Sequence, residues 1–308
     1  MSHEYAQSFA EWGTPRQLPR CEGWLLVRST PGGKHLDAMG LYPRFVCHDW
    51  SQLADDLRSQ STDVAPTQPA PIAVSLVSDP FGTWQGSPLD ESQLSSIFTR
   101  VTPFKTHYVV HLVEPPETFI SRHHRQYTRL AQRHVTVEHV EQSSTQLDAW
   151  DSLYAHLAAR HHLRGIKRFS RTAFAQQLQA PGIKMFVARD ATGTIIGGQL
   201  WYVHGERAYH HLAACSPSGY DLQASYALYD FALRHFRGEV QWLDLGAGAG
   251  VSSAEEDGLA WFKRGWSNAT RQVYFCAQVL DQRAYDDLRA AVPTSDANYF
   301  PAYRAGEF

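Results

Sequence analysis

The segment from Val240 to Ser253, VQWLDLGAGAGVSS, limits the possible folds of this chain more than any other feature. A hydrophobic strand, an acidic residue and glycines at 246, 248 and 250 are typical of the nucleotide-binding loop of S-adenosylmethionine-dependent methyltransferases. In that doubly wound sheet at least four strand–helix units follow the loop, which requires about 120 residues at about 30 per unit. Only 58 of the 308 residues follow Gly250. The position of the motif therefore excludes the methyltransferase fold.

The composition is that of a globular chain with a substantial core. Hydrophobic residues make up 43% of the sequence, and 308 residues suit one large domain or two ordinary ones. The formal net charge of −3 gives no overall positive field that would attract DNA. No segment approaches the about 20 apolar residues that span a bilayer, and the N-terminus lacks the pattern of a secretion signal. We therefore expect a cytoplasmic protein that is not inserted into a membrane.

Cysteine and histidine spacing gives no indication of a metal site. The cysteines at 21, 47, 215 and 276 are too far apart for paired zinc or redox motifs, so we expect reduced thiols in or near the core. Histidine doublets begin at 123, 161 and 210. Adjacent histidines point in different directions, and no carboxylate or cysteine stands near them at ligand spacing. We expect no bound metal.

The first half of the chain reads as a mixed α/β unit with few clear helices. Strand-like apolar runs cover 23–29 and 44–49 before a loop rich in Pro, Ser and Thr at 59–71. Two more such runs, at 72–79 and 107–113, follow that loop.

The second half has a clearer pattern. From about residue 115 a helix is expected, with Phe119, Ile120, Tyr127 and Leu130 on one side. The following segments predict, in order, a strand, two helices, three strands, a helix, a strand, a short helix and a strand. Their approximate ranges are 135–140, 147–157, 170–178, 184–190, 194–203, 207–214, 220–236, 240–245, 257–266 and 271–279.

This order resembles the core of the GCN5-related N-acetyltransferase (GNAT) superfamily, and three segments are similar to its Fem family of peptidyl transferases. The segments are RQYTRLAQRHVTV, with His134 where the family has glycine, then RHHLRGIKRFSRTAF, and last LDLGAGAG followed by DGLAWFKRGW. The resemblance covers residues 115 to 280 well and the first half only by position.

The resemblance implies an α/β (α+β) fold with tandem GNAT-like domains, each a mixed, mostly antiparallel sheet flanked by helices. A degenerate first domain would occupy residues 1–114 and a complete transferase domain 115–284. The tail, 285–308, would pack back on the first domain.

The acyl donor is inferred from the absence of one loop that binds coenzyme A in other members of the superfamily. Acetyltransferases bind the pyrophosphate of coenzyme A on a loop of pattern R/Q-x-x-G-x-G/A at a helix N-terminus. The equivalent segment here, 213–223, lacks the basic residue and the paired glycines. Fem relatives have also lost this loop, and many use an aminoacyl-tRNA ester. The resemblance therefore implies aminoacyl-tRNA as co-substrate, no bound cofactor, and transfer to the amine of a small acceptor such as a cell-wall precursor or specialised metabolite. An acyl-CoA donor and a non-catalytic binding module remain alternatives.

Lys263 and Phe262 are the catalytic residues that the resemblance implies. Transfer from an ester to an amine passes through a tetrahedral oxyanion, which a fixed positive charge stabilises best in a dry site. Lys263 would supply that charge, and Phe262 would form a wall of the acyl pocket. By spacing alone, the pair could equally be a surface lysine after a core phenylalanine.

Two arginines are expected to bind the acceptor. Arg168 follows Gly165 at the family's spacing, and with Arg164 it would meet a phosphate of the acceptor, since guanidinium groups bind such anions in a bidentate manner. A solvated basic turn is the alternative.

Tyr202, Tyr209 and Asp244 complete the expected substrate site. The tyrosines lie on successive strands, where they would line the cleft or only pack within the sheet. Asp244, at a strand end, would orient the acceptor amine or serve the structure alone.

A basic stripe is the expected tRNA-binding surface. Arg122, Arg125, Arg129 and Arg133 recur at spacings of three and four, and no acid interrupts 121–134. Binding of tRNA phosphates there would weaken steeply with salt. A solvated helix face is the alternative.

Overall fold

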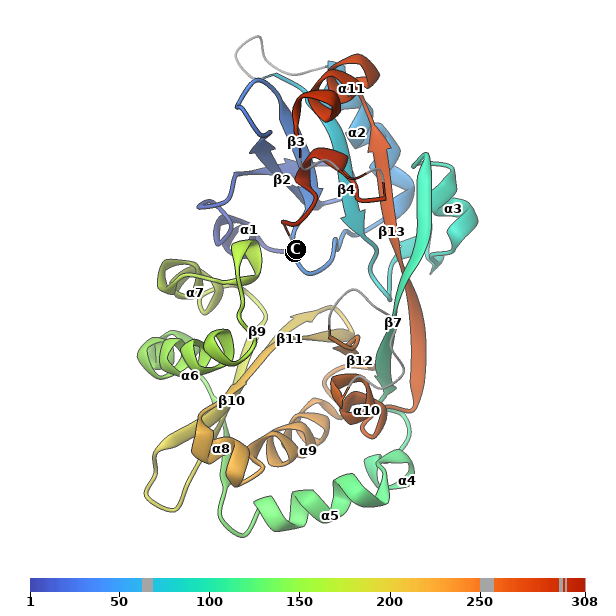
Figure 1. Cartoon of the computed structure of the whole chain (residues 1–308). Helices are drawn as coiled ribbons and strands as arrows, with labels where there is room; N and C mark the ends of the chain where they lie inside the picture. The colour runs from blue at the N-terminus through green and yellow to red at the C-terminus, as the bar shows by residue number, and fades with distance from the viewer. Residues whose placement is uncertain (63–68, 250–257, 294–295, 297, 308) are drawn as a thin grey trace. The chain divides into compact units, whose positions relative to one another are not determined.

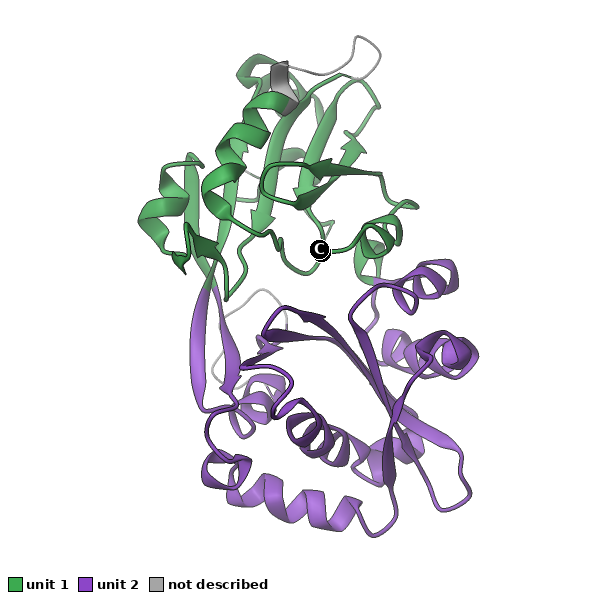
Figure 2. Ribbon diagram, turned by 180° about the vertical axis from the view of Figure 1, so that it is seen from behind, with its two compact units in different colours: residues 1–104, 164–167, 273–308 green, residues 105–163, 168–272 purple. Residues whose placement is uncertain are grey.

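The computed structural model describes residues 1–62, 69–249, 258–293, 296 and 298–307. The chain forms two compact units (Figure 2). Unit 1 comprises 1–104, 164–167 and 273–308, and unit 2 comprises 105–163 and 168–272. Strands β7 (Arg100–His111) and β13 (Ala269–Val279) each contribute residues to both units. The units thus divide inside these two strands, whereas the domain boundaries expected from the sequence follow residues 114 and 284.

Unit 1 is built on a mixed sheet with strand order β1, β2, β3, β4, β13. Neighbouring strands are antiparallel except β3 and β4, which are parallel. All but the last residue of β2 are buried, as a strand covered on both faces requires. The first four strands are β1 (Thr14–Leu18), β2 (Gly23–Ser29), β3 (Leu36–Gly40) and β4 (Pro71–Val77).

Helices and short turns surround this sheet (Figure 1). Helix α3 (Glu91–Ser95) begins with a capping box at Asp90. The Asp90 carboxylate accepts the backbone N–H of Gln93, and the Gln93 side chain accepts the backbone N–H of Asp90. The elements are α1 (His3–Gln7), η1 (Trp50–Gln52), α2 (Leu53–Thr62), β5 (Thr83–Trp84), β6 (Ser87–Pro88), α3 (Glu91–Ser95), η3 (Gly165–Lys167), α11 (Gln282–Ala291) and η4 (Ala302–Arg304).

The strand expected at 44–49 is not formed. Phe45, Val46 and Cys47 are buried there, but they are joined to their surroundings by single backbone bonds such as Phe45 N–H to Val77 O rather than by a ladder. Asp49 then caps η1 by accepting from the Ser51 N–H. The apolar run therefore lies in the core as a loop. Its hydrophobicity alone does not distinguish a buried loop from a strand.

The C-terminal segment contacts strands of its own unit. Tyr285 and Tyr303 pack with Ile72 of β4, and the Tyr285 hydroxyl accepts a hydrogen bond from the backbone of Ala302. A charged network joins η4 to β2 and β3 through Arg304.

Unit 2 is built on six strands in the order β7, β12, β11, β10, β9, β8. Every neighbouring pair is antiparallel except β11 and β12, which are parallel. The expected mixed, mostly antiparallel sheet is thus confirmed. The remaining strands are β8 (Thr136–Val140), β9 (Ile183–Arg189), β10 (Ile195–His204), β11 (Arg207–Cys215) and β12 (Trp242–Gly246).

Two adjacent glycines in β10 allow helices to pack closely on both faces of this sheet (Figure 1). A Cβ at Gly197 would lie 3.3 Å from Leu228 of α9, and one at Gly198 would lie 3.4 Å from Trp150 of α6. The helices of unit 2 are α4 (Pro116–Phe119), α5 (Arg122–Ala131), η2 (Ser143–Gln146), α6 (Leu147–Arg160), α7 (Arg171–Gln177), α8 (Pro217–Asp221), α9 (Ala224–Phe236) and α10 (Gly258–Arg264).

The single helix expected from residue 115 is instead two helices. α4 ends at Phe119, and Ser121 caps α5 by accepting the backbone N–H of His124 at 3.2 Å. The break changes the phase of the helix, so that α5 buries His124 and Thr128 while Leu130, expected on the apolar side, is 38% exposed. From 135 to 280 the predicted order is confirmed, except that Gln223, at φ +58°, divides the long helix into α8 and α9.

None of the helices in the described ranges is long and apolar enough to cross a membrane.

Candidate active site

Asp244 is fully buried near the end of β12, where it accepts hydrogen bonds from the loop that follows and from the neighbouring strand. The Gly246 N–H donates to it at 2.7 Å. His107, on the neighbouring strand β7, lies with Nδ1 2.9 Å from its Oδ1. Because a carboxylate only accepts, Nδ1 of His107 carries the hydrogen. The expected strand-end carboxylate therefore fixes both a histidine ring and the first turn of the glycine loop.

The glycine loop is held by two lysines. Lys263 Nζ donates to Ala247 O at 2.7 Å, and Lys105 Nζ donates to Gly248 O at 2.9 Å. Gly246 has φ +80°, and a Cβ there would lie 3.0 Å from Lys263 Nζ. Glycine at 246 thus permits both the turn and the approach of the ammonium. Gly250, the last glycine of the motif, lies outside the described residues.

Lys263 is only 7% exposed although it lies on a short helix, α10. The surface position that spacing alone allowed is therefore not adopted. A buried ammonium costs desolvation free energy unless it is compensated, and such costs are typical of functional positions. Its catalytic role stays a prediction.

Phe262 lies in an aromatic environment between α5 and α9. Its ring centroid is 5.0 Å from those of Tyr226 and Tyr229, both in edge-to-face geometry. Burial first, and then the nearby carboxylate of Asp244, raises the pKa of Tyr229, so its hydroxyl stays protonated at neutral pH. Phe262 thus packs among aromatic rings, and its role as a wall of the acyl pocket stays a prediction.

His124 links α5 to α10. Its Nε2 lies 2.8 Å from Phe262 O, and its Nδ1 lies 2.7 Å from Ser121 Oγ. Since a backbone carbonyl only accepts, Nε2 carries the hydrogen and Nδ1 accepts from the serine hydroxyl when the ring is neutral. Burial is the main cause that lowers the pKa of His124, which favours this neutral form.

Gly265 makes this link possible. A Cβ at residue 265 would lie 2.1 Å from the His124 ring, and the Gly265 carbonyl accepts the Ser121 N–H at 3.0 Å. The glycine after Phe262-Lys263-Arg264 thus lets the histidine approach the helix that carries the two expected catalytic residues.

His107 and His124 were not predicted as site residues. His124 belongs to a doublet that was considered only for metal binding, and His107 begins an apolar strand. Their partners are 137 and 138 residues away along the chain, so the only signal was two histidines in otherwise apolar faces.

Tyr202, Tyr209 and Asp244 form one cross-strand row. Tyr202 of β10 pairs in register with Tyr209 of β11, which pairs with Asp244 of β12. Directly opposed residues share a face of the sheet, so the structure brings these three expected residues together. Tyr209 is buried, whereas the Tyr202 hydroxyl donates to Gln177 O of α7 at 3.3 Å.

Arg164 and Arg168 are both exposed. They fall in different units, Arg164 in unit 1 and Arg168 in unit 2, with buried Ile166 between them in sequence. Their predicted role in acceptor binding stays a prediction.

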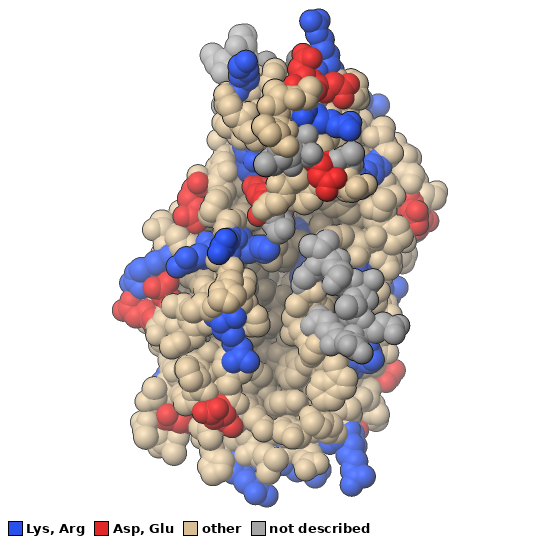
Figure 3. All heavy atoms as spheres, in the orientation of Figure 1, with Lys and Arg blue, Asp and Glu red and all other residues tan. Residues whose placement is uncertain are grey.

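Three of the four stripe arginines line an open pocket on α5. The pocket has a volume of about 340 Å³ and is formed by Arg122, Arg125, Gln126 and Arg129. Figure 3 shows Lys and Arg side chains at the lower edge of its face, over α5 of Figure 1. Arg125 also donates to Glu117 O at 3.1 Å and so connects α5 to α4. Arg133 lies beyond the end of α5 and does not line the pocket.

The remaining expectations concern the cysteines and a metal site. Cys21, Cys47, Cys215 and Cys276 are free and buried, as predicted. Within the described ranges, no group of three His, Cys, Asp or Glu side chains is placed to hold a metal ion.

Comparison with known proteins finds one family model and several solved structures that are similar to this chain. Residues 118–257 match the family model described as an acetyltransferase (GNAT) domain, and no curated protein sequence matches the chain. Among solved structures, FemX is similar with a TM-score of 0.67 and 13% identity, over 92% of each chain.

Two further structures are similar at the level of the fold. The C-terminal domain of a putative lysylphosphatidylglycerol synthetase from Agrobacterium fabrum has a TM-score of 0.63 and 16% identity, over 91% of this chain and 87% of that one. The structure named L-PGS from Bacillus licheniformis has a TM-score of 0.58 and 13% identity, over 91% and 92%. Residues 118–257 thus match a GNAT family model, and the chain has the GNAT-like fold, shared with FemX, that the resemblance implied.

Proposed function

We propose that this protein is a Fem-like N-acyltransferase that moves an aminoacyl group from aminoacyl-tRNA to the amine of a small acceptor, a cell-wall precursor or a specialised metabolite. The observation that carries the proposal is the buried ammonium of Lys263 at the loop that ends β12. The match to an acetyltransferase domain supports acyl transfer as the class of reaction. FemX and the C-terminal domain of a putative lysylphosphatidylglycerol synthetase share the fold.

The reaction assigns a role to each group near Lys263. The acceptor amine attacks the ester carbonyl, a C–N bond forms, and the C–O bond to the ribose breaks. The amine loses a proton and the departing ribose oxygen gains one. Negative charge collects on the carbonyl oxygen in between, and an ammonium fixed in a site of low dielectric stabilises it at that moment. Phe262 would exclude water from the same space.

Asp244 would act as a positioning residue. It is fully buried and already accepts from His107 and from the Gly246 N–H, so it fixes the ring and the loop beside the ester. A histidine held by a carboxylate at Nδ1 is an arrangement used elsewhere to orient the second ring nitrogen toward a reacting group. Asp244 would orient the acceptor amine through His107, with Tyr202 and Tyr209 along the same row.

The donor would be recognised through its phosphates. Arg122, Arg125 and Arg129 line a pocket on α5, and Arg125 is held in place by the carbonyl of Glu117. The chain as a whole carries a formal net charge of −3, so this local concentration of arginines is the feature that would attract a polyanion. Arg168 and Arg164 would bind a phosphate of the acceptor.

An acyl-CoA donor is the second candidate, because the matching family model is an acetyltransferase domain. The structure of the segment before α9 counts against it. Gly219 packs against β10, where a Cβ would lie 2.0 Å from Ile196 O, so this glycine serves close packing of the backbone. Ser216 caps α8 and accepts the Gly219 N–H at 3.1 Å, which uses a donor that a pyrophosphate would need.

A donor assay distinguishes the two candidates. The purified protein is incubated with charged tRNAs or with acyl-CoAs and a panel of labelled amines, with and without ribonuclease. Transfer from charged tRNA that ribonuclease abolishes is the expected result. Transfer that survives complete digestion of tRNA would exclude the aminoacyl-tRNA reaction and favour acyl-CoA. Absence of transfer from either donor would leave a non-catalytic binding module.

A further inference from the structure

Four aromatic side chains form a partly exposed cluster beside the arginine pocket. The cluster, called here the aromatic platform, consists of His123 and Tyr127 of α5, Tyr226 of α9 and Trp261 of α10. His123 stacks on Tyr127 with 4.2 Å between ring centroids, and Tyr127 stacks on Tyr226 with 5.2 Å. Trp261 stands edge-to-face on His123 at 5.0 Å. Three helices of unit 2 thus contribute to one aromatic surface.

The platform is open to solvent on the side of α10. Trp261 is 47% exposed, and Leu259, two residues earlier on the same helix, is 41% exposed. A large apolar side chain exposed beside other aromatic rings marks a surface that can bind a partner. Trp261 is therefore the part of the platform on which a planar ligand group can stack.

Charge identifies the kind of ligand. Arg122 and Gln126 of the pocket each immediately precede a platform residue, His123 and Tyr127. Consecutive helical residues point about 100° apart, so an arginine row and an aromatic row run side by side along α5. A ligand that satisfies both rows carries regularly spaced negative charges and flat rings. Single-stranded nucleic acid has this combination, and proteins bind it with basic grooves and aromatic stacking surfaces.

The position of the platform relates it to the ester. Trp261 directly precedes Phe262 and Lys263 on α10, and His124, next to His123, holds the Phe262 carbonyl. A nucleotide stacked on Trp261 would therefore lie on the same short helix that carries the groups assigned to the acyl ester, about half a turn away from Lys263. We infer that the aromatic platform binds the unpaired nucleotides at the 3′ end of the donor RNA and so delivers the ester to Lys263; this inference rests on the proposed function.

A lipid surface is a less suitable occupant. α10 has seven residues, and its exposed apolar side chains are Leu259 and Trp261, which is far less than the apolar face of an interfacial helix. The parallel stacking of His123, Tyr127 and Tyr226 continues a stack of planar groups rather than an aliphatic surface.

The test compares an uncharged tRNA with the same tRNA trimmed of its unpaired 3′ nucleotides. Binding is measured by fluorescence anisotropy for wild type and for Trp261→Ala. Wild type is expected to bind the intact tRNA about tenfold more tightly than the trimmed one, within the range for loss of base stacking on an aromatic side chain. Trp261→Ala should lose this preference and bind trimmed tRNA as wild type does. Trp261→Phe, which keeps a ring, should retain most of the preference.

Trp12→Ala is the matched control, since Trp12 is 36% exposed in unit 1. It should bind both tRNAs as wild type does, and thermal melting checks that each variant is folded. If Trp261→Ala keeps the wild-type preference while wild type transfers from charged tRNA, the platform is wrong and the proposed function stands. If wild type neither binds tRNA nor transfers from it, both fail. Loss of binding to phosphatidylglycerol vesicles in Trp261→Ala, with tRNA binding unchanged, would instead assign the platform to a lipid surface and overturn the inference.

Discussion

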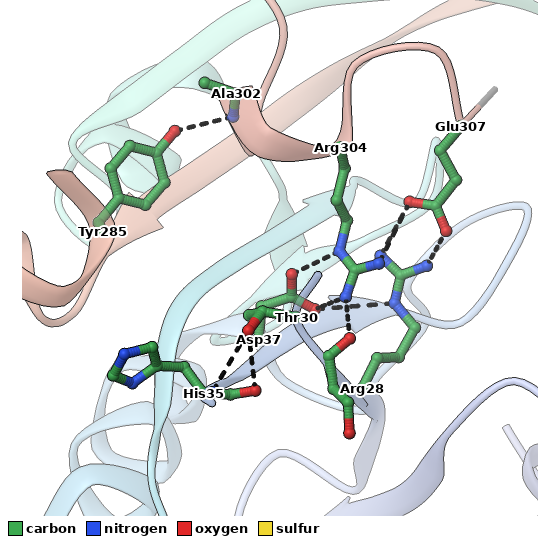
Figure 4. Close-up of polar contacts among 9 residues, drawn as sticks. Arg28, Thr30, His35, Asp37, Tyr285, Ala302, Arg304 and Glu307 are labelled. Atoms are coloured by element: carbon green, nitrogen blue, oxygen red, sulfur yellow. Dashed lines mark hydrogen bonds and ion pairs between the residues drawn. The ribbon is translucent and has the colours of Figure 1, made fainter. Parts of the chain in front are cut away.

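Each unit buries a polar network, and the two networks are built differently. In unit 1, Arg304 donates to both carboxylate oxygens of Asp37, and Arg28 lies in ion-pair distance of Asp37 and also donates to Glu307 (Figure 4). Two arginines thus meet two carboxylates. In unit 2, Lys263 and Lys105 donate to the carbonyls of Ala247 and Gly248.

The two networks are assigned different roles. Opposite full charges in unit 1 compensate each other, and they attach η4 to β2 and β3. In unit 2 the hydrogen bonds from Lys263 and Lys105 fix two ammonium groups at the carbonyls of the glycine loop. Under the proposed function, the Lys263 ammonium held there stabilises an oxyanion.

The largest effect is expected from removing a charge in unit 1. Asp37→Asn leaves Arg28 and Arg304 without their shared carboxylate, and breaking such a buried pair costs about 3–5 kcal/mol of the free energy of unfolding. Urea denaturation measures this. The control is Asp148→Asn, because the Asp148–Arg171 ion pair is exposed and such pairs contribute about 0–1 kcal/mol. Equal losses in the two variants would contradict the structural role of the unit 1 network.

Lys263→Met is expected to act on the reaction instead of the fold. Loss of an oxyanion-stabilising group lowers kcat by about 10²–10³-fold, and methionine fills a similar volume without a charge. The measurement is the rate of transfer from charged tRNA, together with thermal melting. Lys34→Met, at an exposed position, is the matched control and should keep wild-type activity. Near-wild-type turnover in Lys263→Met would remove this lysine from the site.

A smaller effect is expected at the link between α5 and α10. Gly265→Ala brings a methyl group to 2.1 Å from the His124 ring, so the ring or the helix must move, at a cost typical of overpacking, about 1–3 kcal/mol. In a His124→Ala background the same substitution should cost much less, because its contact is gone. A double-mutant cycle measured by urea denaturation gives the coupling free energy. Additive effects would show that the contact does not hold α10.

The smallest expected effect is a change with pH. Burial lowers the pKa of His124 below its ordinary 6.5, so the unfolded chain binds a proton more readily than the folded one. The contribution of neutral His124 is present above pH 6.5 and decreases as the pH falls through 6.5 toward the folded pKa. His124→Gln should therefore lose less stability than wild type between pH 7.5 and 5.5. An unchanged pH dependence would show that folding does not lower the pKa of His124.

Much of the fold of unit 2 could be predicted from local pattern. Strand alternation, helical spacing and turn residues predicted the order of elements from 135 to 280, and the position of the glycine motif excluded the methyltransferase fold. Three local predictions failed, the strand at 44–49, the unbroken helix after 115 and the unbroken helix at 220–236. In the first two cases apolar residues occur where the backbone is decided by a cap, at Asp49 and at Ser121, and in the third Gln223 has a positive φ.

The candidate site was predicted only in part. Lys263, Phe262, Asp244 and the arginine stripe were named from residue type and resemblance, and the structure places Lys263, Phe262 and Asp244 near the same loop. His107 and His124 were not predicted, since Asp244 and Phe262, the residues that tie them to the site, lie 137 and 138 residues away along the chain.

The sequence by itself therefore determined the class of fold, through periodicities that each segment carries alone. Only the tertiary structure decided which polar groups share a site, because contacts such as His107–Asp244 and His124–Phe262 join segments 137 and 138 residues apart. Burial of Lys263 is of the same kind. From the sequence alone, a lysine on a seven-residue helix is expected at the surface. Only the tertiary structure shows that Lys263 is buried.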